Sequence, residues 1–334
     1  MKNDIRKISV VMCTYNGECY LEEQLNSILC QNYPIYEIII TDDCSSDHTW
    51  DILLKYQQRY PNLLFCERNT RNLGYHINFI GSLRKASGDF IAISDQDDIW
   101  HLDKLEVMAN NVGDKLLLIS NSEIIDVNKT SIGKLYDKLD IADFLLEKLI
   151  WENHVYGHAC MINRKVVDLI DSSIEPSSHD YTIALICSSL ESIAVIDKEL
   201  QKWRRHSEAS TWQYQTVNIE YKKKLSGTSK MILAVWGLIT GNKSEIIKRG
   251  FLKIEGILNS VSNEKEVIVH IEEIKKIAIL MSKQTFFSYI KATYQCWKLR
   301  DEMFGYHEKI EIKERIAVFT FVFRWWYDHQ SSMS

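Results

Sequence analysis

Short apolar runs alternate with amphipathic stretches over the first 120 residues of this 334-residue chain. The apolar runs have the length of strands, and the stretches between them place leucine and isoleucine at helical spacing, as in Leu21, Leu25 and Ile28. This pattern predicts strands at 8–13, 37–41, 63–67, 90–94 and 116–120, and helices at 20–31, 49–60, 75–86 and 102–112. Such an alternation favours an α/β fold with a mostly parallel, doubly wound, Rossmann-like sheet.

The charge balance and the spacing of apolar residues change near Trp212. Residues 1–214 carry 21 Lys and Arg against 32 Asp and Glu, whereas residues 215–334 carry 19 against 13, so a balance of −11 is followed by one of +6 and the net charge is −5. The second part also lacks proline and has helical spacing throughout. We therefore expect two domains, with the sheet in residues 1–212 and an α-helical C-terminal region in residues 213–334.

Several classes of protein are disfavoured. The eight cysteines include no Cys-x-x-Cys pair and no zinc-like spacing, which is typical of reduced thiols in a cytosol. The apolar run at 8–13 does not resemble a signal peptide, and the longest later run, 316–323, is too short to span a membrane. The acidic first part and the lack of a known binding pattern argue against nucleic acid. We expect a cytoplasmic protein that binds no nucleic acid.

Polar and acidic residues follow three of the predicted strands. Thr14-Tyr15-Asn16-Gly17 follows the first, Asp42-Asp43 the second, and Asp95-Gln96-Asp97-Asp98 the fourth. Turn formation or helix capping explains each segment singly. Ligands of such sheets, however, bind beyond the carboxyl ends of the strands, where all three segments meet. Crowded carboxylates resist burial unless a cation is bound, so a divalent metal is expected at this edge.

These residues suggest an activated nucleotide as the ligand. Asp42 or Asp43 can accept a hydrogen bond from the ring N–H of a pyrimidine, with the backbone near Thr14 and Tyr15 beside it. A metal held by Asp97 and Asp95 would bridge a diphosphate to the carboxylates and neutralise the charge of a departing nucleoside diphosphate.

The series Thr14–Gly17, Asp42–Thr49, Asn72-Leu73-Gly74 and Ser94–Trp100 resembles family 2 of the inverting glycosyltransferases, which have the GT-A fold, over about residues 5–210. The Asp-Gln-Asp-Asp-Ile-Trp form is most similar to the bacterial branch called rhamnosyltransferases, which builds capsule, O-antigen and wall polysaccharides. The resemblance implies a metal-dependent, non-processive transfer of one sugar, with Mn²⁺ or Mg²⁺ as cofactor.

The resemblance also implies roles for matching positions. It places the following residues in the nucleotide and donor pocket: Thr14, Tyr15, Asn16, Asp42, Asp43, Asn72, Gly74, Asp95, Gln96, Asp98, Gly157, His158 and Arg205. It implies metal ligation by Asp97, Asp95 and His206, the last from the segment Trp203-Arg204-Arg205-His206. Asp98 is expected to orient the loop or the sugar, and Trp100 to pack in the core. Lys104 is expected to be solvated, with phosphate contact as the alternative. Arg204 and Arg205 could hold the diphosphate, with exposure to solvent as the alternative.

Inverting transfer needs a base, and the resemblance assigns this role to Asp180 in Ser178-His179-Asp180. Capping of the following helix is the alternative for Asp180, and His179 is an alternative base.

The helical third carries basic and aromatic clusters at 222–224, 248–249 and 319–327. Clustered Trp, Tyr and Arg suit a membrane interface, where a lipid-linked glycan acceptor would be presented at the inner face of the cell membrane. Helix packing or a homodimer contact is an equally good explanation of the aromatics.

Two other functions remain open at this stage. A nucleotidyltransferase needs a glycine-rich basic loop after the first strand, which Cys13–Gly17 does not supply. A non-catalytic sugar-nucleotide or glycan-binding module would keep the pocket without turnover. The base pocket does not distinguish UDP-linked from dTDP-linked donors, because both bases present the same ring N–H.

Overall fold

The structure is a computed structural model of the whole chain. It describes residues 5–171, 178–206, 234–235, 238, 244–262, 264, 267–268, 270–304, 317–318 and 320–326. The expected domain boundary near Trp212 and the lysines at 222–224 lie outside the described residues.

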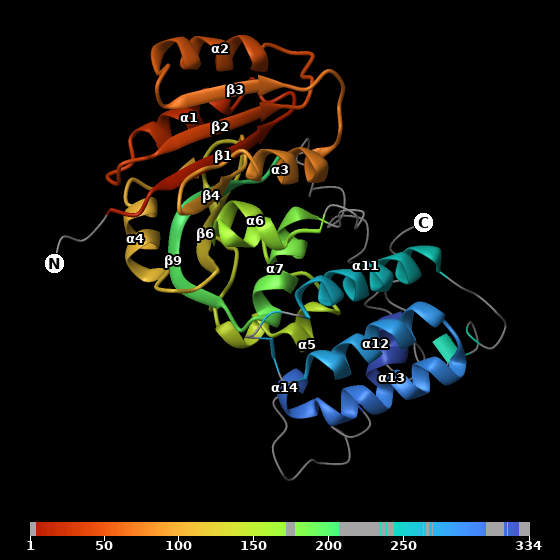
Figure 1. Cartoon of the computed structure of the whole chain (residues 1–334). Helices are drawn as coiled ribbons and strands as arrows, with labels where there is room; N and C mark the ends of the chain where they lie inside the picture. The colour runs from red at the N-terminus through yellow and green to blue at the C-terminus, as the bar shows by residue number, and fades with distance from the viewer. Residues whose placement is uncertain are drawn as a thin grey trace.

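A single sheet of nine strands forms the centre of the molecule (Figure 1). Its order is β3-β2-β1-β4-β8-β6-β9-β5, and β7 pairs with β6. The strands are β1 Ile8–Thr14, β2 Glu37–Asp42, β3 Leu64–Arg68, β4 Phe90–Ser94, β5 Ile99–Trp100, β6 Leu117–Ile125, β7 Ser131–Lys134, β8 Cys160–Asn163 and β9 Ile193–Arg204.

The expected parallel sheet is confirmed for β1 to β4, and β6 also runs parallel to β9. The sequence pattern did not predict that β8 lies antiparallel between β4 and β6, or that β5 pairs antiparallel with β9. Strand β9 continues to Arg204, and its pairing with β6 shifts register twice.

Helices cover both faces of the sheet, and its strands are therefore buried on both sides. Along β1, Ile8, Val10 and Met12 belong to one apolar cluster and Val11 and Cys13 to another. The first cluster includes residues of α1 Leu21–Leu29, α2 Thr49–Arg59 and α4 Lys104–Asn111. The second includes residues of α3 Tyr75–Leu83, α5 Leu146–Leu149, α6 Lys165–Leu169 and α7 His179–Ser189, near the single turns η1 Ile141–Phe144 and η2 Gly157–Ala159.

The C-terminal helices extend this second core without interruption. They are α11 Glu245–Val261, α12 Ile271–Lys283, α13 Phe286–Lys298 and α14 Arg300–Phe304. Helix α11 packs on α7, α12 on α11 and α13 on α12, so the helices form a stack beside the sheet (Figure 1). Ile183 of α7 and Ile254 and Ile274 of this stack lie in one buried cluster.

The described aromatic side chains of the 319–327 segment pack against other helices. Phe323 and Trp326 are buried near Tyr289, and the indole Nε1 of Trp325 donates a 2.9 Å hydrogen bond to the carbonyl of Trp151. These contacts favour helix packing over membrane contact for this segment. Among the described helices, none is both long and apolar enough to cross a membrane.

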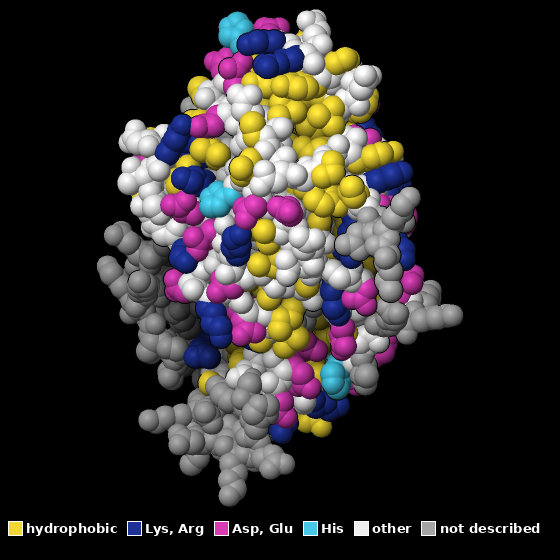
Figure 2. All heavy atoms as spheres, turned by 90° about the vertical axis from the view of Figure 1, so that its left-hand side faces the viewer, with side chains coloured by type: hydrophobic (Ala, Val, Ile, Leu, Met, Phe, Trp, Pro, Cys, Tyr) yellow, Lys and Arg dark blue, Asp and Glu magenta, His cyan; other side chains and the backbone are white. Residues whose placement is uncertain are grey.

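The side of the molecule in Figure 2 carries basic and acidic side chains side by side, around an apolar area in its upper half. The visible described atoms therefore present no extended field of one charge on that side.

Replacing Trp326 by alanine should lower the free energy of unfolding by about 3–5 kcal/mol, because the indole is fully buried. Phe287→Ala on the exposed side of α13 is the control, and it should change stability by less than about 0.5 kcal/mol. Urea denaturation followed by circular dichroism measures both. A small loss in Trp326→Ala would show that the indole does not hold the helices together.

Candidate active site

The carboxyl ends of β1, β2 and β4 open into one cavity of about 660 Å³. Later segments of the chain close it, with residues from between β7 and β8, from the start of α7 and from the end of β9. The lining residues are Cys13, Thr14, Tyr15, Asn16, Gly17, Cys19, Tyr20, Asp43, Asn72, Gly74, Tyr75, Asn78, Phe79, Asp95, Gln96, Asp97, Tyr156, Gly157, His158, His179, Asp180, Trp203, Arg204 and His206.

Most of the candidate site residues line this cavity. Thirteen of the sixteen do so, and they come from segments far apart in the sequence: Thr14, Tyr15, Asn16, Asp43, Asn72, Gly74, Asp95, Gln96, Asp97, Gly157, His158, Asp180 and His206. The structure does not place Asp42, Asp98 or Arg205 in the lining. Asp97 and Asp180, the expected metal ligand and base, share the cavity.

The two aspartates after β2 have different environments. Asp42 is fully buried beneath the cavity, where it accepts a 3.1 Å hydrogen bond from the Thr14 hydroxyl and forms a 3.2 Å ion pair with Arg68. Asp43 reaches the cavity, and its carboxylate accepts bonds of 2.9 Å from the backbone N–H groups of Leu73 and Gly74. Asp43 therefore fixes the loop before α3, whose Gly74 has a φ of +82° that favours glycine.

Gln96 fastens the acidic loop to the loop after β1. Its side-chain oxygen accepts a 2.9 Å bond from the N–H of Tyr15, and its nitrogen donates a 3.0 Å bond to the carbonyl of Tyr15. A Cβ on Gly17 would lie 2.2 Å from the Gln96 oxygen, so this contact requires glycine. The geometry gives Gln96 a positioning role within the protein.

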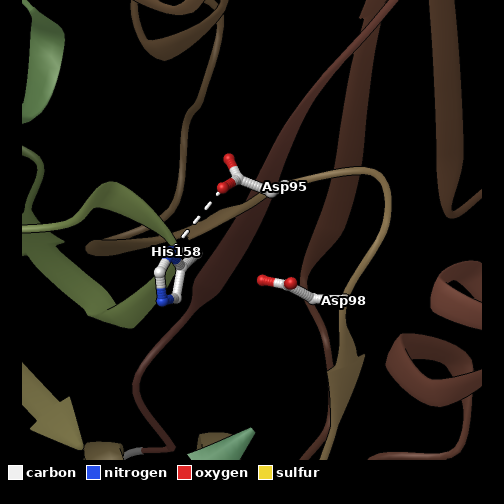
Figure 3. A group of neighbouring side chains, drawn as sticks. All are labelled: Asp95, Asp98 and His158. Carbon is white, nitrogen blue, oxygen red and sulfur yellow. Dashed lines mark ion pairs between the residues drawn. The ribbon is translucent and has the colours of Figure 1, made fainter. Parts of the chain in front are cut away.

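The carboxylates of the acidic loop point in different directions. Asp97 Oδ2 lies 2.8 Å from His206 Nε2 at the cavity wall. Asp95 Oδ2 faces His158 Nδ1 at 3.6 Å, and Asp95, Asp98 and His158 bring one ligand atom each within 4.8 Å of one another (Figure 3). Asp95 therefore lies between two sets of possible metal ligands, Asp97 with His206 and Asp98 with His158.

Burial and neighbouring groups shift the pKa values of Asp95 and Asp98 in opposite directions. Burial would raise the pKa of Asp95, but the interaction with His158 outweighs it and the pKa lies below its usual value. At Asp98, burial and then the charges of Asp97 and Asp95 raise the pKa well above its usual value. The Asp98 carboxyl accepts a 3.1 Å bond from the N–H of Arg204.

Lys104 is fully buried, so the prediction of a solvated residue was wrong. Its ammonium donates a 2.8 Å bond to the carbonyl of His158 and another bond to the side-chain oxygen of Gln201, and it lies 4.1 Å from the centroid of the Trp100 ring. Trp100 itself is buried, as expected. Burial lowers the pKa of Lys104 to about 7, against the opposing charge of Asp98.

Arg204 is not exposed to solvent either. Its guanidinium is buried, donates a 2.9 Å bond to the carbonyl of Asp97 and forms a 2.7 Å ion pair with Glu23. Arg205 places its guanidinium carbon 4.5 Å from the centroid of Trp203.

Asp180 lies in the first turn of α7, but it is not the capping residue. The cap is Ser178, whose hydroxyl accepts a 3.3 Å bond from the N–H of Tyr181. The Asp180 carboxylate receives a 3.5 Å contact from the amide nitrogen of Asn153 and keeps its position at the cavity wall. A carboxylate in the first turn is stabilised as an anion by the helix dipole.

His179 packs beside Asp180 as an uncharged ring. It stacks on Phe79 with ring centroids 4.1 Å apart, and neither ring nitrogen has a hydrogen-bond partner among the described residues. Burial lowers its pKa against the charges of Asp180 and Asp95. A Cβ on Gly157 would lie 2.6 Å from His179 Nε2, so glycine is required there.

Sequence reasoning missed several parts of the site. His158 stacks on Trp203 at 5.0 Å, and the ring of Tyr20 lies 5.0 Å from that of His206. Glu23 supplies the charge that balances Arg204. The helical spacing of Tyr20 and Glu23 places both on one side of α1 and its preceding turn, but no motif marks them.

This arrangement defines a class of protein. A polar cavity at the carboxyl edge of a doubly wound sheet, an acidic loop after the fourth strand and a carboxylate at a helix start opposite agree with the GT-A fold.

Comparison with known proteins agrees with this class. The family described as Glycosyl transferase family 2 matches residues 9–170, and these residues are therefore a family 2 glycosyl transferase domain. A crystal structure of Staphylococcus aureus TarS 1-349 in complex with UDP-GlcNAc aligns over 92% of this chain and 94% of that chain with a TM-score of 0.51 and 18% identity. That likeness shows a shared fold.

Curated bacterial relatives match the N-terminal part. The dTDP-rhamnosyl transferase RfbG of Shigella flexneri is 38% identical over 99 residues, which are 28% of this chain and 34% of RfbG. WfgD of Escherichia coli, a UDP-Glc:alpha-D-GlcNAc-diphosphoundecaprenol beta-1,3-glucosyltransferase, is 34% identical over 132 residues, 38% of this chain and 49% of WfgD. The match thus spans a third to a half of these relatives.

The buried Lys104 gives a pH-dependent prediction. An unfolded lysine has a pKa of 10.5, so between about pH 7 and pH 10 the unfolded chain binds more protons and Lys104 makes stability rise with pH. Lys104→Met should lack this rise, so the unfolding free energy of the wild type minus that of the variant should increase with pH. Urea denaturation at several pH values measures it, with the exposed Lys165→Met as control. A constant difference would contradict a depressed pKa.

Proposed function

We propose that the protein is a metal-dependent, inverting and non-processive glycosyltransferase of bacterial surface polysaccharide synthesis. It transfers one sugar from a pyrimidine nucleoside-diphosphate donor to a hydroxyl group of a glycan acceptor. The observation that carries the proposal is that the acidic loop and Asp180 line one cavity, which lets a donor diphosphate and an acceptor hydroxyl meet.

The donor set fits a divalent cation. The cavity is lined by four aspartates, Asp43, Asp95, Asp97 and Asp180, and a donor diphosphate adds further negative charge. We assign Mn²⁺ or Mg²⁺ to Asp95, Asp97 and His206, because these three line the cavity and Asp97 and His206 lie together at its wall, whereas Asp98 is buried outside the lining. When bound, the cation would neutralise the diphosphate as it leaves.

Asp180 acts as the general base in this proposal. Its carboxylate takes the proton of the acceptor hydroxyl while that oxygen bonds to the anomeric carbon of the donor. The bond between this carbon and the diphosphate oxygen breaks at the same time, so configuration inverts and the nucleoside diphosphate leaves. Asn153 orients the carboxylate, and His179 fills the wall behind Gly157.

The donor is proposed to be dTDP-rhamnose or a UDP-hexose. The names of RfbG and WfgD state dTDP-rhamnosyl and UDP-glucose donors, both pyrimidine nucleotides. Asp43, Thr14 and Tyr15 lie where a base would bind at the ends of β1 and β2. WfgD also acts on a lipid diphosphate by its name, and we propose a lipid-linked acceptor at the inner face of the cell membrane.

Asp97→Asn should weaken Mn²⁺ binding by about tenfold or more, because it removes a charged ligand. Asp98→Asn is the matched control and should have a much smaller effect, since this side chain is fully buried and lies outside the cavity lining. Calorimetric titration with MnCl₂ alone measures both. If Asp98→Asn instead weakened Mn²⁺ binding more than Asp97→Asn, the metal would be assigned to the group of Asp95, Asp98 and His158.

Asp180→Asn should lower kcat by about 10²–10⁴-fold and leave the Kd of UDP or dTDP unchanged, because the base acts only on the acceptor. The exposed Asp143→Asn is the control and should keep full activity. Release of nucleoside diphosphate with sugar acceptors measures turnover. A wild type that binds donor but never turns it over would instead be a non-catalytic binding module.

A further inference from the structure

One side of α13 exposes apolar side chains to solvent. Phe287 is 74% exposed, Ile290 44% and Tyr294 56%. These residues recur at the spacing of one helix side, and the opposite side packs inward through Tyr289 and Ala292. A helix that is apolar on two sides has a second surface for a partner.

The exposed side continues into a groove between α12 and α13. The groove has a volume of about 490 Å³ and is lined by Lys276, Ile279, Leu280, Ile290, Lys291, Tyr294 and Gln295. In the stack α11–α12–α13, α13 is the outermost helix, remote from the sheet (Figure 1). We name this surface, formed by the groove with Phe287, Lys283 and Lys298, the α12–α13 face.

The charge of this face is entirely positive. Residues 274–300 carry five lysines and one arginine and no aspartate or glutamate, in a chain whose net charge is −5. Lys276, Lys283, Lys291 and Lys298 are all exposed. No carboxylate among the described residues forms an ion pair with any of these four. The nearest acid in sequence, Glu273, lies in the first turn of α12.

We infer that the α12–α13 face binds the surface of an anionic lipid bilayer. Exposed lysines beside exposed aromatic and aliphatic side chains are the combination that interfacial binding uses, with ammonium groups at lipid phosphates and apolar groups at the acyl boundary. Lys298 extends over the ring of Tyr294 at 5.2 Å, so charge and apolar surface lie within one patch.

The charge also decides against a second copy of this chain as the partner. In a twofold dimer the same face meets itself, which would bring the lysines of α13 against those of the other copy. Anionic headgroups remove this repulsion. The inference goes beyond sugar transfer, because the face lies outside the cavity and lipid binding needs neither donor nor acceptor.

Flotation of the full chain with vesicles tests the inference. The protein should float with phosphatidylcholine vesicles that contain about one third phosphatidylglycerol, much less with pure phosphatidylcholine, and less as salt rises from about 0.05 M to about 0.5 M. Phe287→Ser with Lys291→Glu should weaken binding at least about tenfold, and Tyr294→Ser with Lys298→Glu should do the same.

The control is Ile132→Ser with Lys138→Glu, which likewise replaces an exposed apolar residue by serine and an exposed lysine by glutamate, but in β7 and the loop after it, outside α12 and α13, and should bind as wild type does. Circular dichroism confirms that each variant is folded. Wild type that stays unbound on anionic vesicles, or two folded face variants that bind normally, would overturn the inference. So would face variants that turn a dimer into monomers with unchanged lipid binding, which would assign the face to a second copy.

Discussion

The buried guanidinium of Arg204 holds the two halves of the site together. It joins the end of β9 to the acidic loop through the carbonyl of Asp97 and to α1 through Glu23, while the backbone N–H of Arg204 donates a bond to the Asp98 carboxyl. Such a charge is tolerated inside a protein because its partners are charged or fully polar. The loop that carries Asp97 is thereby fixed before any ligand arrives.

Burial then divides the acidic loop. Asp98 is fully buried and accepts a bond from the N–H of Arg204 at the end of β9, whereas Asp95 and Asp97 face imidazoles at the cavity. Of these four neighbouring residues, Asp98 anchors the end of β9, Gln96 holds the loop after β1, and Asp95 and Asp97 supply two carboxylates to the cavity. This arrangement would give a divalent cation a rigid binding site whose charge is partly neutralised, which supports the proposed role of the loop in metal binding.

Helix α7 connects the cavity to the C-terminal helices. Its first turn carries Asp180, and its later residues share one apolar core with α11 and α12. The position of Asp180 therefore depends on packing far from the sheet. The same helical stack ends in the α12–α13 face, so a surface that binds lipid would be rigidly joined to the helix that carries the proposed base.

The sequence predicted β1 to β4, their helices and the edge where the cavity lies, because local periodicity and parallel topology determine these features. It predicted the acids of the loop but not their separate environments, since the burial of Asp98 and Lys104 arises from β9, which is remote in sequence. Arg204 resembled a solvated basic residue for the same reason. The lysines of α12 and α13 were missed because basic residues on a helix are ordinary until their common side is visible.

The most direct test of the account is calorimetry of UDP and dTDP binding with Mn²⁺ and with a chelator. The account predicts that a diphosphate binds at least about tenfold more weakly without metal, whereas uridine or thymidine alone binds equally in both conditions. Equal diphosphate binding with and without metal, or no nucleotide binding at all, would contradict a cavity in which Asp95 and Asp97 receive the donor through a cation.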